Sequence, residues 1–311
     1  MALLIDIGHD GWMRNEDLAQ KLKAFFPGAD IRTREALGDP AEVTMVAVSR
    51  LSEDLPGLLP NLQLVQKLGA GVETIVAHPA LPPHIRVTRL RPDAPAREIA
   101  EWFLAHILVR QRNLREYAKA QEERRWSPIE PAETPETTVG VLGLGTIGAR
   151  SALLLRDLGY RVVGWSASPK SLEGVDCRHG QAALPDLLSE CDHVCCILPS
   201  TPQTRDLFDA AMLARMKPGG TLLNAGRGDL IDEAALLAAL AEGTPGHAVL
   251  DVTRTEPLPQ DSPLWSDPNV TITPHVSGWH LGDALTDVAE NYRRLVEGTP
   301  LLHEVDRTRG Y

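Results

Sequence analysis

Three polar residues that could carry out acid–base chemistry each follow an apolar run of strand length. They are Arg227, Glu256 and His275, and each lies beside a glycine or a proline. An imidazole can exchange a proton near neutral pH, a carboxylate can orient it, and a guanidinium can hold an anion. The carboxyl ends of strands face the ligand crevice of an open α/β sheet, so we expect the three side chains to converge there. Each residue alone could instead be a surface cation, a turn cap or a structural histidine.

A glycine-rich turn supplies the strongest single motif. Residues 143–148 read Gly-Leu-Gly-Thr-Ile-Gly, after an apolar strand and at the start of a helical run. Gly143 permits a tight turn, Gly145 lets the backbone approach a pyrophosphate, and Gly148 allows close packing of helix and strand. Thr146 and Ile147 lie where the helix opens, and its free N–H groups favour phosphates. We therefore expect a dinucleotide site here, the alternative being a structural turn.

The residues after the next strand bear on which dinucleotide binds. About 20 residues beyond the glycines, an NAD site usually carries an acidic residue that accepts from the ribose. Here the strand ends in Ser166, and Ala-Ser-Pro-Lys follows. Ser166 and Ser168 can donate to a 2′-phosphate and Lys170 can supply positive charge, so NADP(H) is the preferred cofactor. An arginine that could grip the phosphate bidentately is absent, which leaves NAD(H) open.

Strand-length runs alternate with helical runs, which predicts parallel sheets covered by helices on both faces. The first 90 residues form a small α/β domain with five strands, and six strands after residue 137 match a doubly wound nucleotide-binding sheet. One long helix is predicted over Glu98–Arg125, and a final helix over Asp283–Glu297 with Gly298 as its cap. The predicted strands are Leu3–Ile7, Ala29–Thr33, Met45–Val48, Leu62–Lys67, Ile85–Thr88, Thr138–Leu142, Arg161–Trp165, His193–Leu198, Thr221–Asn224, Ala248–Val252 and Val270–Thr273.

Composition and charge argue against several classes of function. The formal net charge of −11 disfavours general nucleic-acid binding. No apolar run approaches the roughly 20 residues of a membrane span, and the amino-terminal run lacks the basic flank of a signal peptide. Four cysteines without CxxC spacing fit a reducing compartment. We therefore expect a cytoplasmic protein with core thiols at Cys195 and Cys196, no metal site and no membrane partner.

These motifs together resemble those of the D-isomer-specific 2-hydroxyacid dehydrogenases over nearly the whole chain. Beside the glycines at 143–148, the resemblance rests on Leu-Gly-Ala-Gly-Val-Glu at 68–73, Leu-Pro-Ser-Thr-Pro-Gln-Thr at 198–204, Asn-Ala-Gly-Arg-Gly at 224–228, Asp251 with Glu-Pro-Leu-Pro at 256–259, and Pro-His at 274–275. Within the family, the Gly-Trp-Ser segment at 164–166 and the tail at 305–311 look most like bacterial glyoxylate/hydroxypyruvate reductase A.

The resemblance implies a fold, a reaction and a set of site residues. A doubly wound (Rossmann) nucleotide-binding domain at 96–283 would be inserted in a smaller flavodoxin-like α/β substrate domain, made of 1–95 and 284–311, and the protein would be a homodimer. A small 2-keto acid would be reduced to the D-2-hydroxy acid, with His275 as general acid oriented by Glu256. Arg227 would hold the substrate carboxylate and polarise its carbonyl. The backbone at Ala70, Gly71 and Val72 would receive the same carboxylate. The remaining cofactor contacts would come from Leu198, Pro199, Thr204, Ala225, Gly226 and Asp251.

Other functions stay open at this point. A dinucleotide-sensing regulator would keep the glycine turn and need no proton donor, while phosphoglycerate or formate dehydrogenase activity would use the same fold. Arg50 follows a predicted strand and is a candidate for the outer wall of the substrate pocket. There it would favour a polar or anionic C3 substituent, the alternative being a surface arginine.

Overall fold

A computed structural model describes residues 1–7, 13–69, 71–91 and 93–307 of the 311-residue chain. The chain divides into two compact units, one formed by residues up to 94 and from 280 onward, the other by residues 95–279. The boundaries expected from the sequence, at 95/96 and 283/284, lie close to these. The assignment of one unit to the substrate and the other to the dinucleotide stays a prediction.

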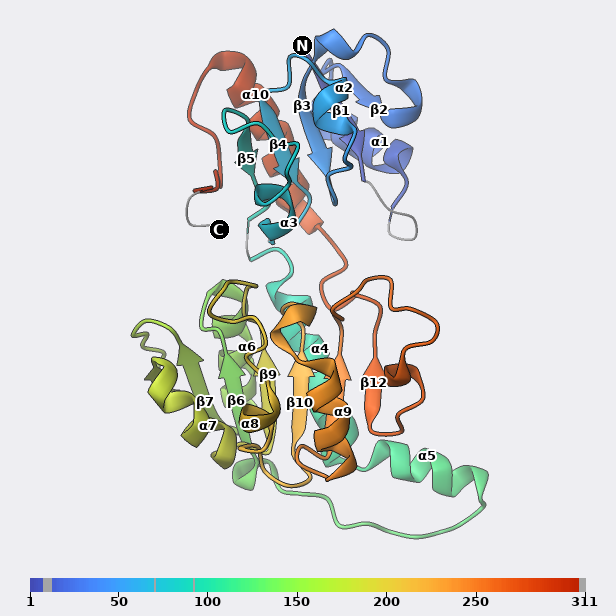
Figure 1. Ribbon diagram of the computed structural model, residues 1–311, viewed down its shortest axis with the longest axis vertical. Helices are drawn as coiled ribbons and strands as arrows, with labels where there is room; N and C mark the ends of the chain where they lie inside the picture. The colour runs from blue at the N-terminus through green and yellow to red at the C-terminus, as the bar shows by residue number, and fades with distance from the viewer. Residues whose placement is uncertain (8–12, 70, 92, 308–311) are drawn as a thin grey trace. The chain divides into compact units, whose positions relative to one another are not determined.

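The first unit is built on a five-stranded parallel sheet in the order β2-β1-β3-β4-β5 (Figure 1). Apolar side chains of alternating strand positions pack against α1 and α10 on one face and against α2 and α3 on the other. This strand order is the flavodoxin-like one and confirms the predicted fold of this unit. The elements are β1 (Ala2–Asp6), α1 (Asn15–Phe25), β2 (Ile31–Thr33), β3 (Val43–Val48), α2 (Leu55–Leu58), β4 (Leu64–Lys67), α3 (Glu73–Val76), β5 (Arg86–Thr88) and α10 (Leu285–Glu297).

The second unit is built on a seven-stranded parallel sheet in the order β12-β11-β10-β9-β6-β7-β8. The first strand of the unit, β6, pairs with both β7 and β9, so the order of strands reverses there. This is the doubly wound arrangement predicted from the sequence, in which ligands bind beyond the carboxyl ends of the strands. The strands are β6 (Thr138–Leu142), β7 (Arg161–Ser166), β8 (Asp176–His179), β9 (His193–Cys196), β10 (Thr221–Asn224), β11 (His247–Leu250) and β12 (Val270–Ile272).

Helices cover both faces of this sheet because successive strand residues point to opposite sides. Cys195 and Leu223 join the core beneath α4 (Ala96–Gln111) and α6 (Thr146–Asp157). Their neighbours Cys196 and Leu222 join the core beneath the opposite helices. Those helices are α7 (Leu184–Glu190), α8 (Ala210–Leu213) and α9 (Glu233–Ala241). Both Cys195 and Cys196 are buried free thiols, which confirms the prediction that they belong to the core.

Two elements differ from the sequence-based prediction. The single helix expected over Glu98–Arg125 is wrong, since the chain forms α4 and then α5 (Leu114–Glu122). The break falls at Asn113, whose left-handed backbone (φ 53°) ends one helix and starts the next, a conformation that asparagine tolerates better than most residues. The strand β8 was not predicted because Asp-Cys-Arg-His has no apolar run, and it forms the sheet edge with no buried side chain.

Short 3-10 turns join several of these elements. They are Arg34–Ala36, Pro40–Glu42, Thr134–Glu136, Gln181–Ala183, Gly228–Leu230, Pro263–Trp265 and Gly282–Ala284. The final helix α10 is capped by Gly298 in the left-handed conformation (φ 66°), as predicted.

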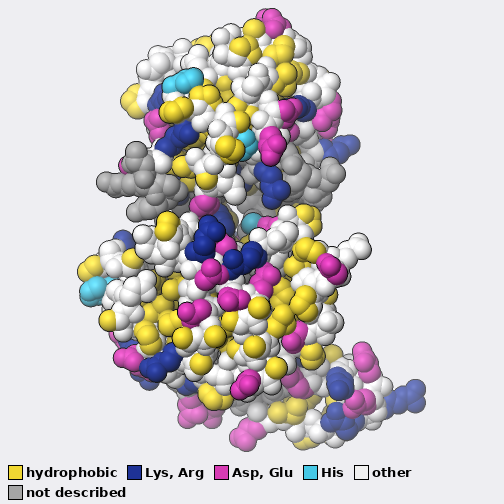
Figure 2. Space-filling model, viewed as in Figure 1, with side chains coloured by type: hydrophobic (Ala, Val, Ile, Leu, Met, Phe, Trp, Pro, Cys, Tyr) yellow, Lys and Arg dark blue, Asp and Glu magenta, His cyan; other side chains and the backbone are white. Residues whose placement is uncertain are grey.

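Basic and acidic side chains are interspersed on the face of the molecule shown in Figure 2. Within the described residues, every helix is too short or too polar to cross a membrane.

Candidate active site

The glycine turn between β6 and α6 has the backbone geometry that a dinucleotide site needs. Gly143 has a positive φ of 105°. A Cβ on Gly148 would lie 1.8 Å from the Gly143 carbonyl oxygen, so only glycine lets the helix start this close to the strand. A Cβ on Gly145 would meet no atom of the described residues within 4 Å, so the backbone is open to an approaching group. Thr146, which is exposed, and Ile147, which packs on the core, form the first turn of the twelve-residue α6. This cradle fits a pyrophosphate at a helix N-terminus.

The loop after β7 carries the residues expected at the 2′-phosphate. Ser166 is buried, and its hydroxyl donates to the Ser168 carbonyl at 2.7 Å. A hydroxyl has one proton, so in this arrangement Ser166 shapes the loop and does not also donate to a phosphate. The side chains of Ser168 and Lys170 are exposed beyond the strand end.

The loops after β6, β9 and β10 are packed so closely that only glycine fits at two positions where they meet. A Cβ on Gly143 would lie 2.9 Å from the Ile197 carbonyl oxygen, and one on Gly226 would lie 2.6 Å from that of Leu198. Thr204 closes the loop after Leu198, because its hydroxyl donates to the Pro199 carbonyl at 2.7 Å. The expected cofactor residues Leu198, Pro199, Thr204, Ala225 and Gly226 therefore belong to one layer of loops. Ala225 is held in this layer by its amide, which donates to the Cys196 carbonyl at 3.0 Å.

The turn that carries Arg227 is fixed by a buried asparagine at the end of β10. Asn224 is fully buried, accepts from the Gly226 amide at 3.0 Å and donates to the Arg227 carbonyl at 2.8 Å. A Cβ on Gly228 would lie 2.0 Å from the Thr253 carbonyl carbon, so this turn presses against the loop after β11. The guanidinium also donates to the Gly226 carbonyl at 2.7 Å.

Asp251, expected to line the cofactor, has its carboxylate turned to the loop after β12. Oδ1 accepts from the Thr273 hydroxyl at 2.5 Å and from the Val276 amide at 2.9 Å, and Oδ2 accepts from the Ser277 amide at 3.0 Å. The Asp251 carbonyl accepts from the His275 amide at 2.8 Å. With 1% of its surface exposed, this residue organises the loop on which His275 sits.

The structure brings His275 and Glu256 into direct contact. The Nδ1–H of His275 donates to Oε2 of Glu256 at 2.9 Å, while the other carboxylate oxygen accepts from the Thr253 amide at 3.1 Å. The His275 side chain is 56% exposed and that of Glu256 31%. One ring nitrogen is thus engaged by the carboxylate, and Nε2 is left as the position that can exchange a proton with a ligand.

The charges around Glu256 keep it ionised. Burial alone would raise its pKa, but the hydrogen bond from His275, the charge of that imidazole, the Thr253 amide and the charge of Arg227 together outweigh burial. The pKa of Glu256 is therefore lowered from its ordinary value of 4.5. The turn that carries Arg227 presses against the loop that carries Glu256, and Glu256 contacts His275, so the three predicted residues lie near one another at the carboxyl edge of the sheet.

The remaining expected residues belong to the first unit. Gly71 and Val72 precede α3, and Val72 is buried, while Ala70 lies outside the described residues. Arg50 is exposed in the loop after β3. Their proposed contacts with substrate stay predictions.

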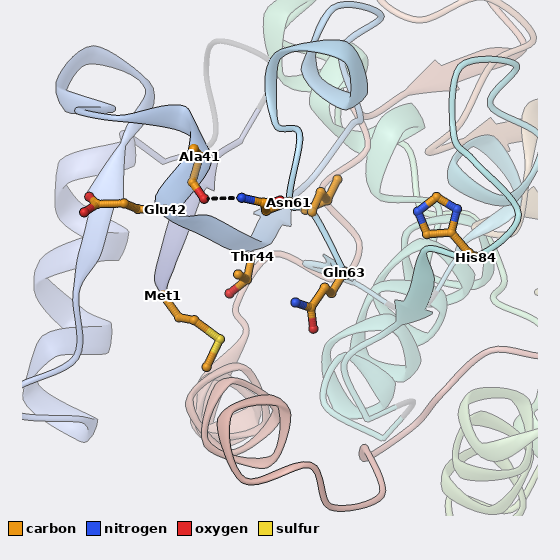
Figure 3. A pocket seen from close by; sticks show the side chains of 8 residues that line it. Met1, Ala41, Glu42, Thr44, Asn61, Gln63 and His84 are labelled. Carbon is orange, nitrogen blue, oxygen red and sulfur yellow. Dashed lines mark hydrogen bonds between the residues drawn. The ribbon is translucent and has the colours of Figure 1, made fainter.

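A surface hollow of about 460 Å³ lies at the amino-terminal edge of the first unit's sheet. Figure 3 shows the Asn61 side chain near Ala41, to whose carbonyl it donates at 2.7 Å. The hollow includes none of the residues expected to bind cofactor or substrate. Its lining residues are Met1, Ala41, Glu42, Thr44, Asn61, Leu62, Gln63 and His84. Within the described residues, groups of His, Cys, Asp or Glu that could hold a metal ion do not occur.

Sequence reasoning missed the residues that support the site from behind. Asn224 was visible only as part of a motif, and its two hydrogen bonds to the turn were not predicted. Thr273 and Trp102, whose side chains are joined at 3.1 Å, are 171 positions apart in the chain. The position of Thr273 directly before Pro-His was the one available signal, and nothing in the sequence pointed to Trp102.

Comparisons with known proteins agree with this architecture. A family model described as "D-isomer specific 2-hydroxyacid dehydrogenase, NAD binding domain" matches residues 104–277. Glyoxylate/hydroxypyruvate reductase A of Klebsiella pneumoniae (strain 342) is 36% identical over 300 residues, which cover 94% of this chain and 95% of that protein.

Solved structures, among them the following two, also match over the whole chain. A D-isomer specific 2-hydroxyacid dehydrogenase from Xanthobacter autotrophicus Py2, in complex with NADPH and MES, is 41% identical with a TM-score of 0.90, covering 100% of this chain and 99% of that one. The NADPH-dependent glyoxylate/hydroxypyruvate reductase from Sinorhizobium meliloti, in complex with NADP and sulfate, is 30% identical with a TM-score of 0.89, at the same coverage. By family model, sequence and fold, the chain belongs to the D-isomer-specific 2-hydroxyacid dehydrogenases, a family of NAD(P)-dependent oxidoreductases.

Proposed function

We propose that the chain reduces a small 2-keto acid, such as glyoxylate or hydroxypyruvate, to the D-2-hydroxy acid with NADPH. The observation that carries the proposal is the hydrogen bond between His275 and Glu256, formed at the carboxyl edge of a dinucleotide-binding sheet. The named relatives support the substrate class, since they are glyoxylate/hydroxypyruvate reductases.

In this proposal His275 is the proton donor. Reduction of a ketone leaves negative charge on the carbonyl oxygen, which must gain a proton. The ionised Glu256 holds Nδ1, so the proton would leave from Nε2. Because Glu256 is itself held by the Thr253 amide, the ring is oriented before substrate arrives.

Arg227 would bind the substrate carboxylate and stabilise the charge that develops on the carbonyl oxygen. Its turn is rigid, since Asn224 bonds to both sides of it and Gly228 presses on Thr253. A positive group here also offsets the net charge of −11, which would otherwise repel an anionic substrate.

The cofactor would be held by the glycine turn at 143–148, with its 2′-phosphate near Ser168 and Lys170. When bound, the nicotinamide supplies the hydride that reduces the carbonyl carbon. The two solved relatives described above contain NADPH or NADP, which supports this preference over NADH. The loop layer at Leu198, Pro199, Thr204 and Ala225 would flank the nicotinamide.

The experiment that tests this function is a rate comparison with NADPH and NADH against a panel of 2-keto acids. We expect NADPH oxidation with glyoxylate or hydroxypyruvate, and slower reaction with NADH. Binding of NADPH, followed by fluorescence, without turnover of any 2-keto acid would favour a dinucleotide-sensing regulator instead. Preferred oxidation of phosphoglycerate or formate would point to those two activities of the same fold.

We also propose a homodimer in the cytoplasm. Large apolar side chains are exposed along α5 and the segment after it, including Leu114, Tyr117, Ile129 and the 98% exposed Trp126. A surface of this kind is typical of a subunit interface. Light scattering of the wild type and of Trp126→Glu tests the dimer, which the charged side chain would weaken. A monomeric wild type would contradict the proposal.

The four free cysteines suit a reducing compartment, which supports the cytoplasmic location.

A further inference from the structure

The helix α4 contacts the segment that carries His275 on both sides of that residue. Before it, the indole Nε1 of Trp102 donates to the Thr273 hydroxyl oxygen at 3.1 Å. After it, Glu98 accepts from the Trp279 amide at 2.7 Å. A Cβ on Gly278 would lie 2.7 Å from Pro95, so the chain lies directly against the start of the helix. One rigid element therefore supports the whole segment.

The hydrogen bonds from Trp102 run in one direction. An indole N–H can only donate, so the Thr273 oxygen must accept from it. The Thr273 hydroxyl then uses its single proton for Oδ1 of Asp251, at 2.5 Å. Asp251 in turn accepts from the Val276 and Ser277 amides. The indole thus fixes the orientation of Thr273, which fixes the carboxylate that holds the loop.

The loop needs such support because His275 has a backbone conformation that is unfavourable for a residue with a side chain. Its φ is 56°, in the left-handed region. Such conformations persist only where the surroundings determine them. The amide of His275 itself donates to the Asp251 carbonyl, and the next amide, that of Val276, donates to the Asp251 carboxylate.

We propose that Trp102 is a positioning residue for the proton donor: through Thr273 and Asp251, its indole N–H holds the His275 loop in the conformation that sets the imidazole against Glu256. The inference rests on the proposed reduction of a 2-keto acid. It assigns Trp102 no contact with substrate or cofactor.

The alternative is that Trp102 only fills space. Its ring packs edge-on against Phe103 and His106, at centroid distances of 5.4 and 4.6 Å. Trp102→Phe retains an aromatic ring at this place and removes the N–H. Thr273→Val keeps the shape of threonine and removes the hydroxyl, while Thr273→Ser keeps the hydroxyl. Trp265→Phe is the matched control, because it removes an indole N–H that donates to Pro259 at 2.9 Å on an exposed turn.

The test is steady-state kinetics of NADPH-dependent reduction by the full-length variants, with thermal unfolding measured in parallel. For Trp102→Phe and for Thr273→Val we expect kcat to fall about three- to tenfold, the effect of losing one hydrogen bond, with the KM for NADPH unchanged. The double variant should be no slower than the slower single variant, since both changes interrupt one chain of bonds. Thr273→Ser and Trp265→Phe should retain the kcat of the wild type.

Several results would overturn the inference while leaving the proposed function intact. They are a wild-type kcat in Trp102→Phe, additive losses in the double variant, or a Thr273→Ser enzyme as slow as Thr273→Val. A loss of kcat that accompanies a lower unfolding temperature and also occurs in Trp265→Phe would show a merely structural role. A wild type that reduces no 2-keto acid would overturn the proposed function itself, and this inference with it.

Discussion

Nδ1 of His275 lies 2.9 Å from Oε2 of Glu256, although the two residues come from loops after different strands, β12 and β11. These strands are neighbours in the sheet, so their carboxyl ends bring the loops together. The Thr253 amide holds the second carboxylate oxygen. The contact is therefore a consequence of strand order and of one local turn, and it leaves Nε2 to act on a ligand.

Removing the imidazole should stop proton transfer and spare cofactor binding. For His275→Gln we expect kcat to fall by about 10²–10⁴-fold, the usual contribution of a general acid. The dissociation constant for NADPH, measured by fluorescence titration, should stay within about twofold. His84→Gln, an exposed histidine of the first unit, is the control. A kcat of His275→Gln within threefold of the wild type would argue against the role of His275.

Two glycines of the same turn should respond differently to alanine. In Gly148→Ala the new Cβ would lie 1.8 Å from the Gly143 oxygen, so we expect a loss of several kcal/mol in unfolding free energy. In Gly145→Ala the Cβ meets no described atom within 4 Å, so stability should change by less than about 0.5 kcal/mol while NADPH affinity falls. Chemical denaturation and fluorescence titration measure the two effects. Unchanged NADPH affinity in Gly145→Ala would mean that the pyrophosphate lies elsewhere.

Lys170 should contribute to the preference for NADPH. Its side chain is exposed next to Ser168, where an ammonium can meet a 2′-phosphate. In Lys170→Ala we expect the ratio of kcat/KM for NADPH to that for NADH to fall about tenfold, mainly through the KM for NADPH. Lys23→Ala, an exposed lysine of the first unit, should leave the ratio unchanged. An equal loss with both cofactors would place the lysine away from the 2′-phosphate.

Much of this fold was predictable because its signals are local. Runs such as Val43–Val48 are buried at every position and apolar at all but Thr44, as expected of strands covered on both faces. The glycines at 143, 145 and 148 predict a turn that few other residues could form. The edge strand β8 and the helix break at Asn113 were not predicted, because neither produces an apolar pattern in the sequence.

The candidate site was predictable in its chemistry but not in its support. Arg227, Glu256 and His275 are recognisable by type and by position after strands. Asp251 was expected beside the cofactor, whereas its carboxylate bonds to the His275 loop. The contact of Trp102 with Thr273 depends on how α4 packs on the sheet, which no local pattern records.

Buried His193 should make the protein less stable in mild acid. Burial lowers the pKa of His193 from 6.5 to about 4. The charges of Arg110 and His247 lower this pKa further, while the charge of Asp192 raises it. Its Nδ1 has no hydrogen-bond partner among the described residues. The unfolded chain therefore binds more protons between pH 6.5 and pH 4, and the unfolding free energy falls as the pH decreases through that window.

Chemical denaturation at pH 7 and pH 4.5 measures this loss, to which His193 should contribute on the order of 2–3 kcal/mol. His193→Val should reduce the difference between the two pH values. His84→Val, which replaces an exposed histidine, should leave it as in the wild type. An unchanged difference in His193→Val would show that other groups cause the acid sensitivity.

The most direct test of the proton-donor pair is kcat for 2-keto acid reduction in Glu256→Gln, in His275→Gln and in the double variant. The lowered pKa of Glu256 keeps this carboxylate ionised at neutral pH, where it holds Nδ1 of His275. Because the carboxylate acts through the imidazole, we expect Glu256→Gln to lower kcat about tenfold and the double variant to be no slower than His275→Gln. A double variant that is slower than His275→Gln by the full factor of the Glu256→Gln change would contradict the pairing of His275 with Glu256 as the source of the proton.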